Sequence, residues 1–242
     1  MKRVIPFLGI IFLFVSCVKN NPDPSWLEVS AWQLNSNPDL IGQQGELTEN
    51  LSNAWVFVDN DFIGVFEVPF KIPLVMEGLK EIKIYPTILN NGISATKTIY
   101  PFVEPYTIVT ELVKNEVTHL DLTTQYKSIT QFTILDFEDA NLGFEDSPTS
   151  LCNIVASNDP AIIQPFNGTS FGRVSLNESL NTWVSATNLD LDYPGSGADV
   201  YLEIDYHITE NLLTGLLAVA PSGVTENPNI QLNEQDPSEV VW

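Results

Sequence analysis

The sequence predicts an all-β protein built from two consecutive β-sheet units, and three observations lead to this expectation. Most of the 242-residue chain alternates apolar and polar residues with a period of two, or forms short runs rich in β-branched residues. Gly, Pro, Asn and Asp separate these runs, as turn residues do between strands. Convincing amphipathic helix patterns are absent. The length allows two domains, each with its own core.

The first 16 residues are expected to form a signal peptide that precedes the fold. Lys2 and Arg3 supply positive charge, and residues 4–16 carry none. These 13 residues are too few to span a bilayer, which needs about 20, but they suit a signal-peptide core. The stretch FVSC resembles a bacterial lipobox, in which Cys17 is lipidated on sulfur, although Phe14 stands where Leu is usual. The alternative is an ordinary secretory signal with an unrelated cysteine.

Lipidation of Cys17 implies an exported protein that is anchored to the cell envelope, with the outer membrane as the expected location. Each methylene of an acyl chain that enters the bilayer contributes about 0.8 kcal/mol to anchoring. Residues 17–25 are polar and Pro-rich and are interpreted as a tether. With Cys17 acylated, Cys152 has no partner in the chain for a disulfide.

Residues 26–126 contain about seven short strand patterns, which favours an immunoglobulin-like sandwich. The first pattern begins at Trp26. Residues 53–69 indicate a hairpin whose turn is centred on Asn60. Trp55 shares one face of this hairpin with Phe57, and the pair is interpreted as sandwich core. Further strands are expected over 78–88, 93–102, 106–114 and 116–126, the first two joined by a turn at Asn91-Gly92.

Residues 132–242 are expected to form a second β-sandwich of the jelly-roll type. The unit opens with FTILDFEDANLGFED, and its strands are expected to be longer than those of the first unit. In the stretch VYLEIDYHI, Tyr201 lies on the polar side of the alternation, and Leu202 and Ile204 lie on the side that faces the core. Strands are expected over 171–177, 182–191, 198–208 and 212–220.

The last residues, PSEVVW, read as the beginning of another strand. This pattern predicts a fragment truncated at the C-terminus, with one or two strands missing. The alternative is that Trp242 completes a genuine terminal strand.

Two stretches carry a resemblance to known proteins. The segments WVFVDNDFIGVFEVPFKIPL and EGLKEIKIYPTILNNGISATKTIYPF resemble a domain of Bacteroidota lipoproteins. Related sandwiches are similar to carboxypeptidase-regulatory-like domains, which implies a spacer or receptor role for residues 25–126. The second unit, with its F-E-D opening and its YLEIDY strand, resembles carbohydrate-binding jelly rolls. Neither resemblance brings a catalytic motif.

The composition is strongly acidic, with 10 basic and 31 acidic residues and a net charge of −21. Without Lys2 and Arg3 the net charge is −23. From Asp136 onward 17 acidic residues accompany a single basic one, Arg173, which leaves this part at −16. Such a surface repels nucleic acid and suits cations or neutral ligands such as sugars. Alternatively, the acidity only keeps the protein soluble.

The sequence offers little catalytic chemistry, so we expect a protein that is not an enzyme. Its two histidines, His119 and His207, lie in strand patterns, and no HExxH or paired-cysteine metal motif is present. Pro194-Gly195-Ser196-Gly197 lacks the spacing of a nucleophile elbow. A glycosidase pair among the many carboxylates remains the alternative, because it depends on a distance that sequence does not give.

Two groups of residues are candidate sites. Asp136, Glu138 and Asp139 form an acidic cluster that predicts a structural Ca²⁺ site, since Ca²⁺ takes carboxylate and carbonyl oxygens. The alternative is a solvated acidic edge that discourages strand addition. Tyr201, Trp183 and Tyr193 are candidate aromatic platforms for a sugar ring; Trp183 alternatively belongs to a core.

These expectations combine into a non-catalytic lipoprotein that acts as a binding or spacer module. The first unit would hold the second away from the membrane, and the second would bind a glycan or an envelope protein. The alternative function is that of a structural or assembly subunit of an envelope complex, with no small-molecule ligand. An exposed aromatic strip favours the first function, and an apolar patch or an unpaired strand edge favours the second.

Overall fold

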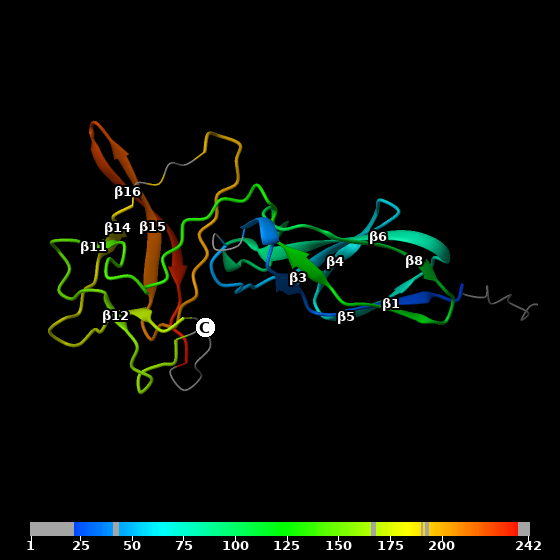
Figure 1. The fold of residues 1–242 in the computed structure, drawn as a ribbon, viewed down its shortest axis with the longest axis horizontal. Helices are drawn as coiled ribbons and strands as arrows, with labels where there is room; N and C mark the ends of the chain where they lie inside the picture. Colours follow the sequence, from blue (N-terminus) through cyan, green and yellow to red (C-terminus); the bar gives the residue numbers. More distant parts are fainter. Residues whose placement is uncertain (1–21, 41–43, 166–167, 190, 192–193, 237–242) are drawn as a thin grey trace, which may run out of the picture. The chain divides into compact units, whose positions relative to one another are not determined.

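In the computed structural model of the chain, the fold is all-β (Figure 1). The structure describes residues 22–40, 44–165, 168–189, 191 and 194–236. Within these ranges, the helical segments are short 3₁₀ turns at Pro38–Leu40 and Asn90–Gly92. The predicted fold class is confirmed at this level, and the finer immunoglobulin-like and jelly-roll orders stay predictions.

Contacts divide the chain into two compact units. The first comprises Met1–Gln33, Leu51–Ile88 and Pro105–Thr124. The second comprises Leu34–Asn50, Leu89–Glu104 and Gln125–Trp242. Two segments that precede residue 126 in the sequence therefore contribute to the second unit. The chain passes between the units at five points, three of which lie within strands, namely β2 (Gln33–Asn35), β6 (Gly78–Leu89) and β10 (Thr123–Gln125).

The first unit consists of two sheets in a sandwich-like arrangement, with β1 and β5 on one side and β6 on the other (Figure 1). In one sheet β1 pairs antiparallel with β5 and parallel with β9. In the other, β3 lies between β4 and β6, and β8 pairs with β6. These strands are β1 (Ser25–Val29), β3 (Asn53–Val58), β4 (Asp61–Glu67), β5 (Phe70–Leu74), β6 (Gly78–Leu89), β8 (Tyr106–Leu112) and β9 (Val117–Leu120).

The core of this unit is aliphatic, and the prediction that Trp55 and Phe57 form it is wrong. Along β3 the residues Ala54, Val56 and Val58 are at most 1% exposed, whereas Trp55 and Phe57 are half-buried. Because side chains alternate across a strand, the two aromatic residues lie on the opposite face. The aliphatic face packs with further buried residues, which include Leu27, Val29, Leu74, Ile82, Ile84, Leu112 and Leu120.

The predicted hairpin over residues 53–69 is confirmed. Its turn residues Asp59 and Asn60 both have positive φ, 50° and 69°, which is the geometry of the tight turns that connect hairpin strands. The Asp59 carboxylate accepts hydrogen bonds from Lys80 Nζ (2.7 Å) and from the backbone N–H of Glu81 (3.0 Å). The bond from Lys80 is the main reason why the pKa of Asp59 is lowered. The turn is thereby fastened to β6.

The predicted turn at Asn91-Gly92 is also present, with φ values of 55° and 69°. It follows β6 and precedes β7 (Lys97–Ile99). Asn and Gly adopt this left-handed region more readily than other residues do, which explains why the dipeptide marks the turn.

In the second unit, four strands are short, although the sequence predicts long ones, and one of them, β12, was not predicted. Each has three residues, and they pair as β11 with β14 and β12 with β13. The opening segment is not a strand before Phe144, because Phe137 has a φ of 62°, which breaks an extended run. The four strands are β11 (Phe144–Asp146), β12 (Val155–Ser157), β13 (Phe171–Arg173) and β14 (Ser185–Thr187).

The alternating segment 198–208 is not a strand either, so this prediction is wrong. Leu202 is 72% exposed and Ile204 is 45% exposed, rather than packed in a core. The backbone N–H of Ile208 donates to the side chain of Gln235 (3.0 Å) instead of to a neighbouring strand. No strand of the described ranges pairs with this segment, so alternation alone does not make a strand.

The longest strands of the second unit form a hairpin, β15 (Leu212–Ala220) with β16 (Gly223–Leu232). The sequence predicts β15 but not β16. A register shift between Thr214 and Gly215 marks a bulge in the pair. At Gly215 a Cβ would lie 2.4 Å from the carbonyl oxygen of Asn227, so the close approach of the two backbones requires glycine.

Candidate functional site

Four aromatic side chains from three neighbouring strands gather on the outer face of the sheet that contains β3. The ring centroids of Trp55 and Phe62 lie 5.3 Å apart, and those of Phe57 and Phe62 lie 5.4 Å apart. Tyr85 continues the row, with its ring edge-on to Phe57 at 5.7 Å. We call Trp55, Phe57, Phe62 and Tyr85 the aromatic face.

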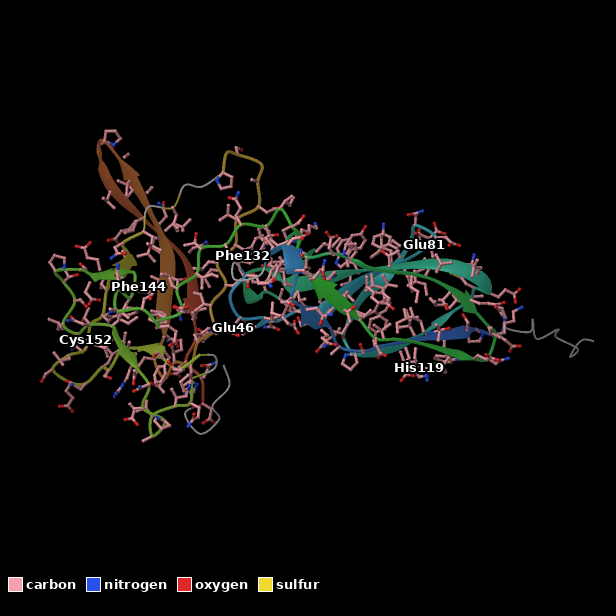
Figure 2. All side chains as sticks on the ribbon, in the orientation of Figure 1. Glu46, Glu81, His119, Phe132, Phe144 and Cys152 are labelled. Atoms are coloured by element: carbon pink, nitrogen blue, oxygen red, sulfur yellow. The ribbon has the colours of Figure 1, made fainter. Side chains whose placement is uncertain are left out.

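Strand pairing places these residues together. Trp55 lies opposite Tyr85 on β6, and Phe57 lies opposite Phe62 on β4. A register shift between Val56 and Phe57 accompanies the second pairing. Figure 2 labels Glu81 on the outer side of β6. Because side chains alternate across a strand, Lys83 and Tyr85 lie on the same side of β6 as Glu81.

The aromatic face combines open apolar surface with a few polar groups. Phe62 is 54% exposed, and the other three rings are half-buried. The indole Nε1 of Trp55 is buried and has no hydrogen-bond partner within the described ranges. Lys83 Nζ lies 6.0 Å from the centre of the Tyr85 ring. Rings flanked by a lysine can stack on a planar apolar group, and the ammonium group can hydrogen-bond to oxygens at its edge.

The other sheet of the first unit presents a row of charged residues on its outer side, where Figure 2 labels His119. Glu28 lies opposite Lys71 on β5 and opposite His119 on β9. Its carboxylate is 2.9 Å from Lys71 Nζ and 3.7 Å from His119 Nδ1. The bond from Lys71 is the main cause that lowers the pKa of Glu28. These residues line a shallow, open groove together with Phe70 and Leu120.

The predicted aromatic platforms of the second unit are partly engaged by their own neighbours. The Tyr201 ring lies 5.6 Å from the rings of both Tyr100 and Phe102, and nearly perpendicular to them. Burial is the main cause that raises the pKa of its hydroxyl. Trp183 is half-buried, and its Nε1 donates to Asp146 Oδ1 at 3.0 Å. Tyr193 lies outside the described residues.

The acidic cluster is used for loop structure. The Glu138 carboxylate accepts hydrogen bonds from Thr169 N (2.7 Å), Thr169 Oγ1 (2.5 Å) and Ser170 N (2.8 Å). These bonds lower the pKa of Glu138. Asp136 Oδ1 accepts from the backbone N–H of Glu138 (3.1 Å), and Asp139 is exposed. In the part of the chain that the structure describes, no three His, Cys, Asp or Glu residues are placed to hold a metal ion. The Ca²⁺ site stays a prediction.

A second acidic pair, which sequence reasoning missed, lies near Tyr126. The Tyr126 hydroxyl and Glu203 Oε2 are 3.4 Å apart, and Asp205 Oδ2 accepts a hydrogen bond from Thr48 at 3.0 Å. Much of the Glu203 side chain is exposed, but burial of its carboxyl group by the surrounding protein raises its pKa. The negative charge of Asp205 raises the pKa of Glu203 further. The two hydrogen-bonded pairs are separated by 77 and 157 positions in the sequence, so no local sequence pattern predicts them.

The structure describes one of the two cysteines, Cys152. Cys17 lies outside the described residues. Cys152 is a free, half-buried thiol whose Sγ lies 3.6 Å from the carbonyl oxygen of Thr182. Among the described residues, no helix has the length and apolar character that crossing a bilayer requires.

The chain was compared with known proteins at three levels. It matches no protein-family model, no curated protein and no solved structure. The resemblances to Bacteroidota lipoproteins and to carbohydrate-binding jelly rolls therefore stay expectations.

Proposed function

We propose that the protein is an exported lipoprotein, anchored at the outer membrane through Cys17, that binds neutral glycans without transforming them. The aromatic face of the first unit is the observation that carries the glycan-binding part of this proposal. Pyranose rings present C–H groups that pack on exposed aromatic rings, and their hydroxyls need polar partners at the edge of the contact.

The geometry favours the aromatic face over the platforms predicted in the second unit. Phe62 offers an open ring, and the ring of Trp55 lies against it. Tyr201, in contrast, already packs against two rings of its own unit.

The charge of the chain favours neutral glycans. A net charge of −21 repels polyanions such as nucleic acids and uronate-rich polysaccharides. Neutral sugars meet no such repulsion, because stacking and hydrogen bonding with hydroxyls need no opposite charge. The alternative function, a structural subunit of an envelope complex, is supported by an exposed apolar hairpin in the second unit.

Lipid anchoring is tested by expressing the full-length precursor in a Gram-negative host and partitioning it between detergent and water. We expect the wild-type protein in the detergent phase and Cys17→Ala in the aqueous phase, because the acyl chains are lost. Cys152→Ala is the matched control and should partition like the wild type. Detergent partitioning that survives Cys17→Ala would contradict the anchor.

Glycan binding is tested by affinity electrophoresis in gels that contain a neutral β-glucan, a galactomannan or a mannan. Phe62→Ala should weaken retardation about two- to twelvefold, since one stacking contact contributes about 0.5–1.5 kcal/mol. Trp55→Ala, which removes the ring that lies against Phe62, should also weaken it. Tyr201→Ala is the comparison for the site predicted from sequence.

The outcomes separate the two sites and the two functions. Retardation that is lost in Tyr201→Ala but kept in Phe62→Ala would move the glycan site to the second unit. Absence of retardation on all three glycans would leave the assembly function as the better account.

A further inference from the structure

The β15–β16 hairpin of the second unit exposes an unusual amount of apolar surface. β15 reads LLTGLLAVA, a run that is apolar on both faces, as strands buried on both sides are. Nevertheless its side chains reach solvent on both faces. The exposed fractions are 62% for Leu213, 51% for Leu216, 50% for Leu217, 80% for Val219 and 62% for Val224.

The two edges of the hairpin differ in their ability to pair with another strand. β15 pairs with β16 and with no other strand of the described ranges. Its outer edge offers nine residues without proline or charge. β16 contains Pro228, which has no N–H to donate, and it carries Glu226. An uncharged edge without proline is the kind to which a further strand adds.

From this asymmetry we infer that the outer edge of β15 is a docking site for an extended strand of a partner protein. The partner strand carries apolar side chains at alternate positions and Lys or Arg at its ends. Backbone hydrogen bonds supply the pairing, and the apolar side chains of the partner strand cover Leu217 and Val219, which share one face of the hairpin. This surface is separate from glycan binding and does not depend on it.

The charge around the hairpin selects a basic partner rather than a second copy of the chain. The part of the chain from Asp136 onward carries −16, and Glu210, Glu226 and Glu234 are exposed near or within the hairpin. A second copy would bring a net charge of −21 toward this surface. Lysines that flank a partner strand are attracted by this negative charge, whereas flanking acids are repelled.

The probe for this proposal is a labelled 12-residue peptide of alternating Val and Thr with two lysines at each end. Its binding to the full chain is followed by fluorescence anisotropy. Two further peptides vary one property each: alternate backbone N-methylation removes N–H donors and keeps the side chains, and Glu in place of the lysines reverses the charge.

We expect saturable binding of the basic peptide, at least tenfold weaker binding of the Glu peptide, and loss of binding on N-methylation. The variant Leu217→Thr/Val219→Thr keeps residues that suit strands but removes apolar contact, and it should weaken binding about tenfold. Leu79→Thr, which alters a 72% exposed residue of the first unit, is the matched control and should leave binding unchanged.

Three results would overturn the proposal. Equal affinity for the N-methylated peptide would show that binding does not use strand pairing. Light scattering that finds a dimer, together with no peptide binding, would make a second copy the occupant. Flotation of the chain with phosphatidylcholine vesicles in the Cys17→Ala background, again with no peptide binding, would assign the hairpin to a lipid surface.

Discussion

Replacing Ile84 by alanine is expected to lower the free energy of unfolding of the first unit by about 2–5 kcal/mol. Ile84 is fully buried on β6, between Val56 of β3 and Tyr106 of β8 in the register of the sheet. The substitution removes methyl groups from a packed interior and leaves a cavity that the surrounding strands fill only in part.

Urea unfolding followed by tryptophan fluorescence measures this effect, because Trp26, Trp32 and Trp55 all belong to the first unit. The matched control is Leu79→Ala on the same strand, whose side chain is 72% exposed. It should change the free energy of unfolding by no more than about 0.5 kcal/mol. Similar losses in both variants would mean that Ile84 does not lie in the core described above.

The second large effect is expected for Gly215→Ala in the β15–β16 hairpin. An added Cβ would lie 2.4 Å from Asn227 O and 2.8 Å from Pro228 Cα, and both are backbone atoms that no side-chain rotation can move away. The hairpin must then open at its bulge, with an expected local cost of about 1–3 kcal/mol. Hydrogen exchange of the amides in β15 and β16 measures it as faster exchange.

Gly195→Ala is the matched control for this substitution, because nothing lies within 4 Å of the Cβ that it adds. Exchange in the hairpin should stay as in the wild type. If Gly215→Ala left exchange in β15 and β16 unchanged as well, the close approach of the two backbones at the bulge would be refuted.

The parts of the fold that follow from local chemistry could be predicted from the sequence. The turns at Asn60 and at Asn91-Gly92 need residues that tolerate positive φ, and the sequence places such residues there. The hairpin over 53–69 follows from the first of these turns. Alternation then assigns Trp55 and Phe57 to a common face, which is correct.

For β3, alternation alone could not decide which of the two faces is buried in the core. Both of its faces are apolar, with Ala54, Val56 and Val58 on one side and the two aromatic residues on the other. The aliphatic side is buried because the facing strands offer aliphatic partners such as Leu27 and Val29. This choice depends on the partner sheet, about which β3 itself holds no information.

Long-range contacts also decided the candidate sites. Tyr201 packs against Tyr100 and Phe102, about a hundred positions away, and Glu138 accepts hydrogen bonds from Thr169 and Ser170. β16 was missed because the sequence TENPN resembles a turn, although its backbone pairs with β15 through the bulge. Composition thus identified reactive residue types, while their partners were set by the tertiary structure.

The pairing of β1 has a mechanical consequence. β1 is hydrogen-bonded on both sides, antiparallel to β5 and parallel to β9, and the chain just before it is fastened by the bond from Asn115 N to Pro24 O (2.8 Å). Tension that pulls the preceding chain along the axis of β1 acts in shear on the hydrogen bonds to β5 and to β9. These bonds share the load at the same time and do not open one after another. A protein tethered from this end resists stretching where the force enters.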